Sequence, residues 1–186
     1  MKRKSGKISR VLTHLLAWAL VSAILWSWVF TFLTDASREN KVVLYADMAE
    51  IRWKDLAVAM EEEMPAGIRL FQAHPFSYAM MNSADVELAD LYIMTAAQAE
   101  KRLDWLTTAP AGLADGRETL ILGEETLGIR LDPAWAEWLS YGEQPGQPWY
   151  LFFGKESLHL SALPGAVDDA GEFFAERLLT PISADE

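Results

Sequence analysis

The strongest constraint in this sequence is a stretch of 23 residues, 11–33, without a formally charged side chain. As a helix with a rise of about 1.5 Å per residue it would span ~34 Å, enough to cross a hydrocarbon core of ~30 Å with some tilt. The stretch begins at Val11 and ends at Leu33. Trp26 and Trp28 lie in its second half, and such rings favour the membrane interface. The sequence therefore predicts one transmembrane helix over 11–33.

Charge is distributed unequally on the two sides of this stretch. Residues 2–10 hold five Lys and Arg and no acid, whereas the other 11 basic residues and all 27 acidic residues lie from Thr34 onward. Because Lys and Arg resist translocation, we expect a single-pass protein of the cell membrane with its N-terminus in the cytoplasm. The expected parts are a basic cytoplasmic head (1–10), the transmembrane helix, a linker (34–40) and an extracytoplasmic domain (41–182).

A cleaved signal peptide is the alternative interpretation of the N-terminus. Residues 34–36, Thr-Asp-Ala, can serve as a cleavage site, and the basic head fits a signal peptide as well. Apolar cores of signal peptides are usually about 7–15 residues long, so the length of 11–33 favours a retained anchor. Both interpretations place the acidic body outside the cytoplasm.

Composition and missing motifs argue against several functions. The chain has no cysteine, which excludes disulfides, iron–sulfur clusters and thiolate zinc sites. Its formal net charge of −11 argues against nucleic acid as a partner. No Gly-x-Ser-x-Gly elbow, Walker loop or dinucleotide fingerprint occurs, and His74 and His159 in the body lack the spacing of a metal site. We therefore expect no enzyme, no catalytic residue, no metal and no cofactor.

The first half of the body alternates between short apolar runs and helix-forming segments. Strands are predicted over 41–46, 67–72 and 89–94, with helices over 49–64, 76–82 and 96–103. This alternation is typical of a parallel sheet with helices on both faces. Right-handed crossovers predict the strand order 2-1-3, with 41–46 in the middle.

The second half has a different pattern. Hairpins are predicted over 119–131 and 149–160, where glycine-containing turns separate apolar runs. Residues 142–148, rich in Gly and Pro, predict a linker, and 166–179 predicts a closing amphipathic helix. The expected fold is one three-layer α/β domain with a mainly parallel sheet and C-terminal hairpins.

Three segments carry a resemblance to a known family. They are Leu44-Tyr45-Ala46-Asp47 before an acidic helix, Gly67-Ile-Arg-Leu-Phe71 after a Pro-Gly break, and Ala89-Asp90-Leu-Tyr-Ile93. The chain resembles the first lobe of bacterial extracellular solute-binding proteins, the type II periplasmic-binding fold of ATP-driven (ABC) importers. Its tail, 149–159, is similar to short membrane-anchored relatives of that group.

The resemblance has consequences for function. Members with full activity have two lobes that enclose the solute, and their chains are about twice as long. The resemblance therefore implies one lobe, an importer component as a protein partner, and weak binding of a small solute at most.

Candidate binding residues follow from the predicted strand ends. Tyr45, Asp47 and His74 lie at or just after the carboxyl ends of predicted parallel strands, where open α/β sheets bind ligands. We therefore interpret the chain as a membrane-anchored binding or accessory domain. A structural or protein-interaction domain without a ligand pocket is the alternative, and an unrecognised enzyme is the least favoured one.

Overall fold

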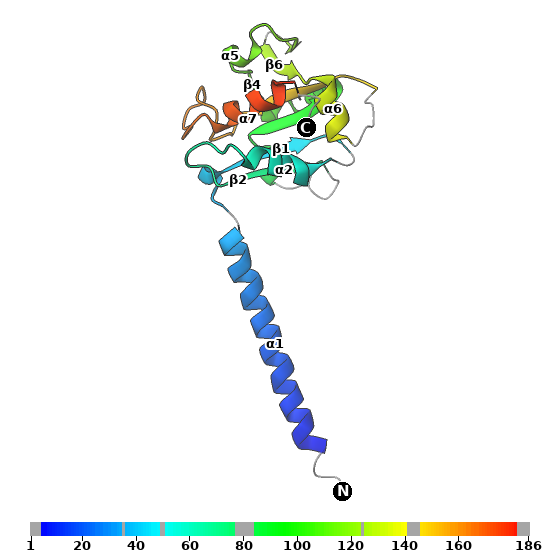
Figure 1. Cartoon of the computed structure of the whole chain (residues 1–186), viewed down its shortest axis with the longest axis vertical. Coiled ribbons are helices and arrows are strands. Elements are labelled where there is room, and N and C mark those ends of the chain that lie inside the picture. Colours follow the sequence, from blue (N-terminus) through cyan, green and yellow to red (C-terminus); the bar gives the residue numbers. More distant parts are fainter. Residues whose placement is uncertain are drawn as a thin grey trace. The chain divides into compact units, whose positions relative to one another are not determined.

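The computed structural model describes residues 5–34, 36–48, 51–76, 84–123, 125–140 and 146–181. The chain divides into two compact units, Met1–Ser37 and Arg38–Glu186. Figure 1 shows the single helix of the first unit and the mixed α/β body of the second.

The first unit contains helix α1 (Ser5–Thr34). Among the side chains that the structure describes, no helical stretch is both long enough and apolar enough to cross a membrane. Trp26 is 71% exposed, and the side chains of Val11, Trp28 and Leu33 lie outside the described residues. The transmembrane span over 11–33 is therefore not confirmed and stays a prediction.

The second unit is built on one seven-stranded sheet. Along the sheet the order is β2-β1-β3-β7-β6-β5, and the short strand β4 pairs with β7. The strands are β1 (Lys41–Ala46), β2 (Leu70–Pro75), β3 (Leu91–Thr95), β4 (Leu106–Thr107), β5 (Thr119–Leu122), β6 (Glu125–Arg130) and β7 (Trp149–Gly154). β1 is parallel to β2 and β3, whereas the β3–β7, β4–β7, β6–β7 and β5–β6 pairs are antiparallel.

The sheet is mixed rather than mainly parallel. β1 lies between β2 and β3 with parallel pairing on both sides, as expected for these three strands, but they form one side of the sheet and not its centre. β6 runs in the same direction as β3, and the short helix α6 (Pro133–Leu139) follows the last residue of β6. The chain then enters β7 at the end of the sheet where β6 and β3 finish. β7 therefore runs antiparallel to both of these strands.

One predicted hairpin is present and the other is wrong. The hairpin over 119–131 is confirmed as β5 and β6. The hairpin over 149–160 does not form, since 157–160 is not a strand. Both sides of β7 are already paired, with β3 on one side and β6 and β4 on the other, so no place remains for a further strand.

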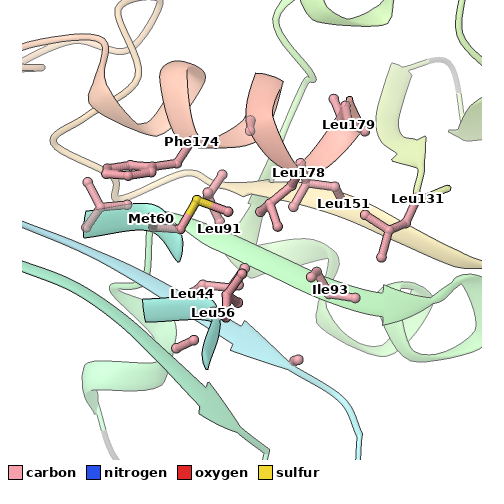
Figure 2. Packing of buried hydrophobic residues seen from close by; sticks show 14 of the residues in the cluster. Leu44, Leu56, Met60, Leu91, Ile93, Leu131, Leu151, Phe174, Leu178 and Leu179 are labelled. Carbon is pink, nitrogen blue, oxygen red and sulfur yellow. The ribbon is translucent and has the colours of Figure 1, made fainter. Parts of the chain in front are cut away.

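Helices cover both faces of the sheet. The remaining elements are η1 (Arg38–Asn40), α2 (Trp53–Glu61), α3 (Ala84–Glu87), α4 (Ala96–Ala99), η2 (Glu100–Trp105), α5 (Ala111–Ala114) and α7 (Ala170–Leu179). Alternate strand side chains point to opposite faces, so each strand contributes to two cores. In the first core Leu44 and Leu151 pack with Leu56 and Met60 of α2 and Phe174 of α7 (Figure 2).

The second core lies on the opposite face of the sheet. There Tyr45, Tyr92 and Phe152 pack with Val86 of α3 and Ala99 of α4. The body is thus a three-layer domain. Part of the helix predicted over 76–82 lies outside the described residues.

Candidate functional site

Four strands end at one edge of the sheet. β1, β2 and β3 are parallel, and β6 shares their direction because both β6 and β3 are antiparallel to β7. β1 therefore ends at Ala46, β2 at Pro75, β3 at Thr95 and β6 at Arg130 along the edge where β7 begins. We call this edge the carboxyl edge; it is the side where open α/β sheets place their ligands.

Two of the three candidate residues lie side by side. Tyr45 and His74 are register partners in β1 and β2, and their ring centroids are 5.4 Å apart. Tyr45 is only 3% exposed and also stacks on Phe76, with 5.7 Å between the ring centroids. Tyr45 is therefore a core residue that supports the edge, whereas His74 is half-buried and reaches its surface. Burial, followed by the charge of Lys41, lowers the pKa of His74.

Asp47 completes the set just after β1. Its backbone N–H donates to the carbonyl oxygen of Ile93 at 2.8 Å, which fixes it beside the end of β3. Burial raises the pKa of the Asp47 carboxyl, and the charges of Arg102 and Lys101 offset part of this rise. Asp47 is thus a half-buried acid that faces two cations from the segment after β3.

Arg102 was not among the residues predicted from the sequence, yet it is central to this edge. It is 7% exposed, and its guanidinium lies over the rings of Phe76 and Trp105, 5.1 and 5.5 Å from their centroids. Its Nη1 donates to the carbonyl oxygen and to the side-chain Oε1 of Gln98, at 3.1 and 2.7 Å. The i, i+4 spacing of Gln98 and Arg102 was the available signal, but nothing in the sequence placed Phe76 under the cation.

Three aromatic rings, those of Phe76, Tyr92 and Trp105, pack in a row behind these residues. Phe76 stacks on Tyr92 with 6.4 Å between the centroids, and Tyr92 lies 6.2 Å from Trp105. The Tyr92 hydroxyl donates to the carbonyl oxygen of Val86 at 2.6 Å, and burial raises the pKa of this hydroxyl. Tyr92 is completely buried in the core, whereas Phe76 and Trp105 are half-buried, so the carboxyl edge offers charged groups with two partly accessible rings beside them.

A cleft of about 370 Å³ lies farther along the same edge. Its lining includes Leu131, Pro133 and Ala136 together with Trp149, and Glu137 adds a charge. The buried Nε1 of Trp149 has no hydrogen-bond partner among the described residues. This cleft is not predictable from the sequence, because its walls come from β6, α6 and β7, which only the fold brings together.

A second polar cluster lies away from this edge and resembles a catalytic triad only in composition. The Ser157 hydroxyl donates to Asp90 Oδ1 at 2.6 Å and accepts from the backbone N–H of His159 at 3.0 Å. The His159 ring instead contacts Asp168 and the Arg38 carbonyl oxygen. With no imidazole on the hydroxyl, the cluster lacks the histidine base of a catalytic triad.

The described residues also contain no group of three or more His, Asp or Glu that could hold a metal ion.

No protein-family model matches the chain, and no curated protein or solved structure matches it significantly.

Proposed function

We propose that this chain is a membrane-anchored, extracytoplasmic binding domain whose carboxyl edge contacts a protein partner. The resemblance to one lobe of a solute-binding protein indicates a component of an ATP-driven importer as that partner. The proposal gives the chain no catalytic role. A structural domain of the same fold without a binding role is the alternative.

One arrangement of residues supports the carboxyl edge as the binding surface. Half-buried Asp47 and His74, from two neighbouring strands, lie at the same edge as the buried cation of Arg102, and Lys101 is exposed next to it. Charged groups beside aromatic rings at a half-buried edge are typical of recognition surfaces, since they provide both orientation and contact area. The packed aromatic row behind them favours a surface contact over an enclosed ligand.

Site-specific photo-crosslinking tests the partner. Lys101 and Lys155 are both exposed, but Lys101 follows β3 at the carboxyl edge and Lys155 follows β7 at the opposite end of the strands. A photoreactive residue at 101 is expected to give an adduct with an importer component in the native cells, and the same residue at 155 is expected to give none. Equal adducts from both positions, or no adduct at 101, would contradict the proposal.

The anchor is supported by the uncharged run 11–33, the preceding cations and the helical conformation of Ser5–Thr34. We predict that the full chain stays with membranes in high salt and at alkaline pH. Replacing both Leu20 and Ile24 by Lys should release it, because each charge near the centre of a span costs about 2.5–3.5 kcal/mol. Replacing both by Ala should not. Mature protein in the medium that begins near Ser37 would show a cleaved signal peptide instead.

The cleft beside Trp149 favours a small solute as a second candidate ligand. Small-molecule pockets usually bury ~70–90% of the ligand, and a single lobe encloses it from one side only. We therefore predict that the full chain binds sugars, amino acids and oligopeptides with a Kd near or above ~1 mM, equivalent to about −4 kcal/mol. Titration calorimetry measures this directly. A low-micromolar Kd for the monomer would make the chain a solute receptor.

A further inference from the structure

His159 is completely buried, and both nitrogens of its ring face oxygen atoms. Nδ1 lies 2.7 Å from Asp168 Oδ1, and Nε2 lies 2.8 Å from the backbone carbonyl oxygen of Arg38. A carbonyl oxygen and an ionised carboxylate only accept hydrogen bonds. Both ring nitrogens must therefore donate at once, which requires the imidazolium form.

The two acceptors are themselves held in place. Asp168 Oδ1 also accepts from the backbone N–H of Ala170 at 3.0 Å, at the start of α7. The Arg38 guanidinium donates to the carbonyl oxygens of Leu88 and Glu156, at 3.2 and 2.7 Å. Arg38 is thus tied to Leu88 and to the segment 156–159, and Asn40 is tied to Gly67 and Arg69.

The charged groups around the ring favour its protonated form. Burial alone would lower the pKa of His159, but the hydrogen bonds to Asp168 and to the Arg38 carbonyl, together with the negative charges of Asp90 and Asp168, raise it above the ordinary value of 6.5. Asp90 faces the ring from the residue before β3, and the Arg38 guanidinium acts electrostatically on Asp90.

We propose that His159, Asp168 and the Arg38 carbonyl form a pH-dependent latch at residues 38–40: the contact between His159 and the Arg38 carbonyl is closed when His159 is protonated and opens when it is neutral, which leaves these residues held by the Arg38 guanidinium and by Asn40. A neutral imidazole has one N–H, and the carboxylate of Asp168 is the stronger acceptor, so Nδ1 keeps the proton. Nε2 then faces the Arg38 carbonyl oxygen with a lone pair, and this buried contact has to open.

The direction of the pH effect follows from proton linkage. Opening exposes the ring and returns its pKa toward 6.5, below that of the closed latch. The latch is therefore fully held below about pH 6.5 and loosens as the pH rises through the pKa of the closed form. Within this window the equilibrium constant for opening increases up to about tenfold for each pH unit.

Amide hydrogen exchange of the full chain in detergent micelles tests the latch. The amides of residues 38–40 in the wild type are compared at each pH with those in His159→Gln, so the intrinsic pH dependence of exchange cancels. We expect wild-type exchange to be at least about tenfold slower at pH 5.5 and to approach that of the variant at high pH. His74→Gln, at the other histidine of the body, should keep the wild-type pattern.

A second measurement does not depend on the variant folding. The ¹⁵N resonances of the His159 ring in the wild-type protein are expected to show two protonated nitrogens at pH 6 and one at high pH. A neutral ring at pH 6, or the same exchange pattern for residues 38–40 in the wild type and His159→Gln, would overturn the latch.

Discussion

Replacing Gly154 by Ala is expected to destabilise the body by about 3 kcal/mol or more, because there is no space for a methyl group at this position. A Cβ at Gly154 would lie 1.9 Å from the carbonyl oxygen of Ala89. The backbone N–H of Gly154 donates to the carbonyl oxygen of Asp90 at 2.9 Å, so the last residue of β7 closely approaches the segment before β3. The methyl group would force these two backbones apart and break that bond.

Gly112→Ala is the matched control for this substitution. Gly112 lies in α5, and an added Cβ there meets nothing within 4 Å. Because Ala restricts the unfolded chain and favours a helix, this variant should gain about 0.5–1 kcal/mol. Urea unfolding followed by near-UV circular dichroism, which reports fixed aromatic packing, compares the two variants. Equal stability of Gly154→Ala and the wild type would show that β7 and residues 89–90 are not in such close contact.

Asp90→Ala is expected to cost about 3 kcal/mol, since it leaves two buried donors without an acceptor. Asp90 is 4% exposed; its Oδ2 accepts from the backbone N–H of Val43 at 2.9 Å and its Oδ1 accepts from the Ser157 hydroxyl. These bonds join β1, the residue before β3 and the turn after β7. Asp90→Asn should cost less, because an amide oxygen can still accept from Val43.

The pH dependence of stability distinguishes the contribution of the Asp90 charge from the contribution of its hydrogen bonds. Burial raises the pKa of Asp90 above 3.8, while the bonds to Ser157 and Val43 and the charges of His159 and Arg38 offset part of the rise. The folded protein therefore holds this proton more tightly than the unfolded chain does. The free energy of unfolding should fall as the pH rises from about 3.8 through the folded-state pKa of Asp90. Asp90→Asn should lack this decrease, and an unchanged pH profile would contradict the assignment.

The sequence by itself determined the elements whose signals are local. An uncharged run with cations before it predicted a helix over 11–33, and the structure has α1 at Ser5–Thr34. Apolar runs and the helix-forming segments between them predicted three parallel strands, and the right-handedness of crossovers predicted 41–46 between the other two. Glycine-containing turns predicted the β5–β6 hairpin. The helix, the strands and the hairpin turn depend on residues close together in the chain, so periodicity and turn chemistry suffice to find them, whereas the order of the three strands follows from a general rule of handedness.

The tertiary structure alone decided which strands pair and which side chains contact one another. The apolar run at 149–154 shows that β7 is buried, but β3 and β6 as its neighbours follow from long-range pairing. Likewise, Arg102 over Phe76 and His159 between Asp168 and the Arg38 carbonyl join residues up to 121 positions apart. Periodicity indicates which face of a strand is buried. Which groups meet across that face depends on competing contacts that exist only once the chain is compact, because the entropy cost of closing long loops is compensated by many such contacts together.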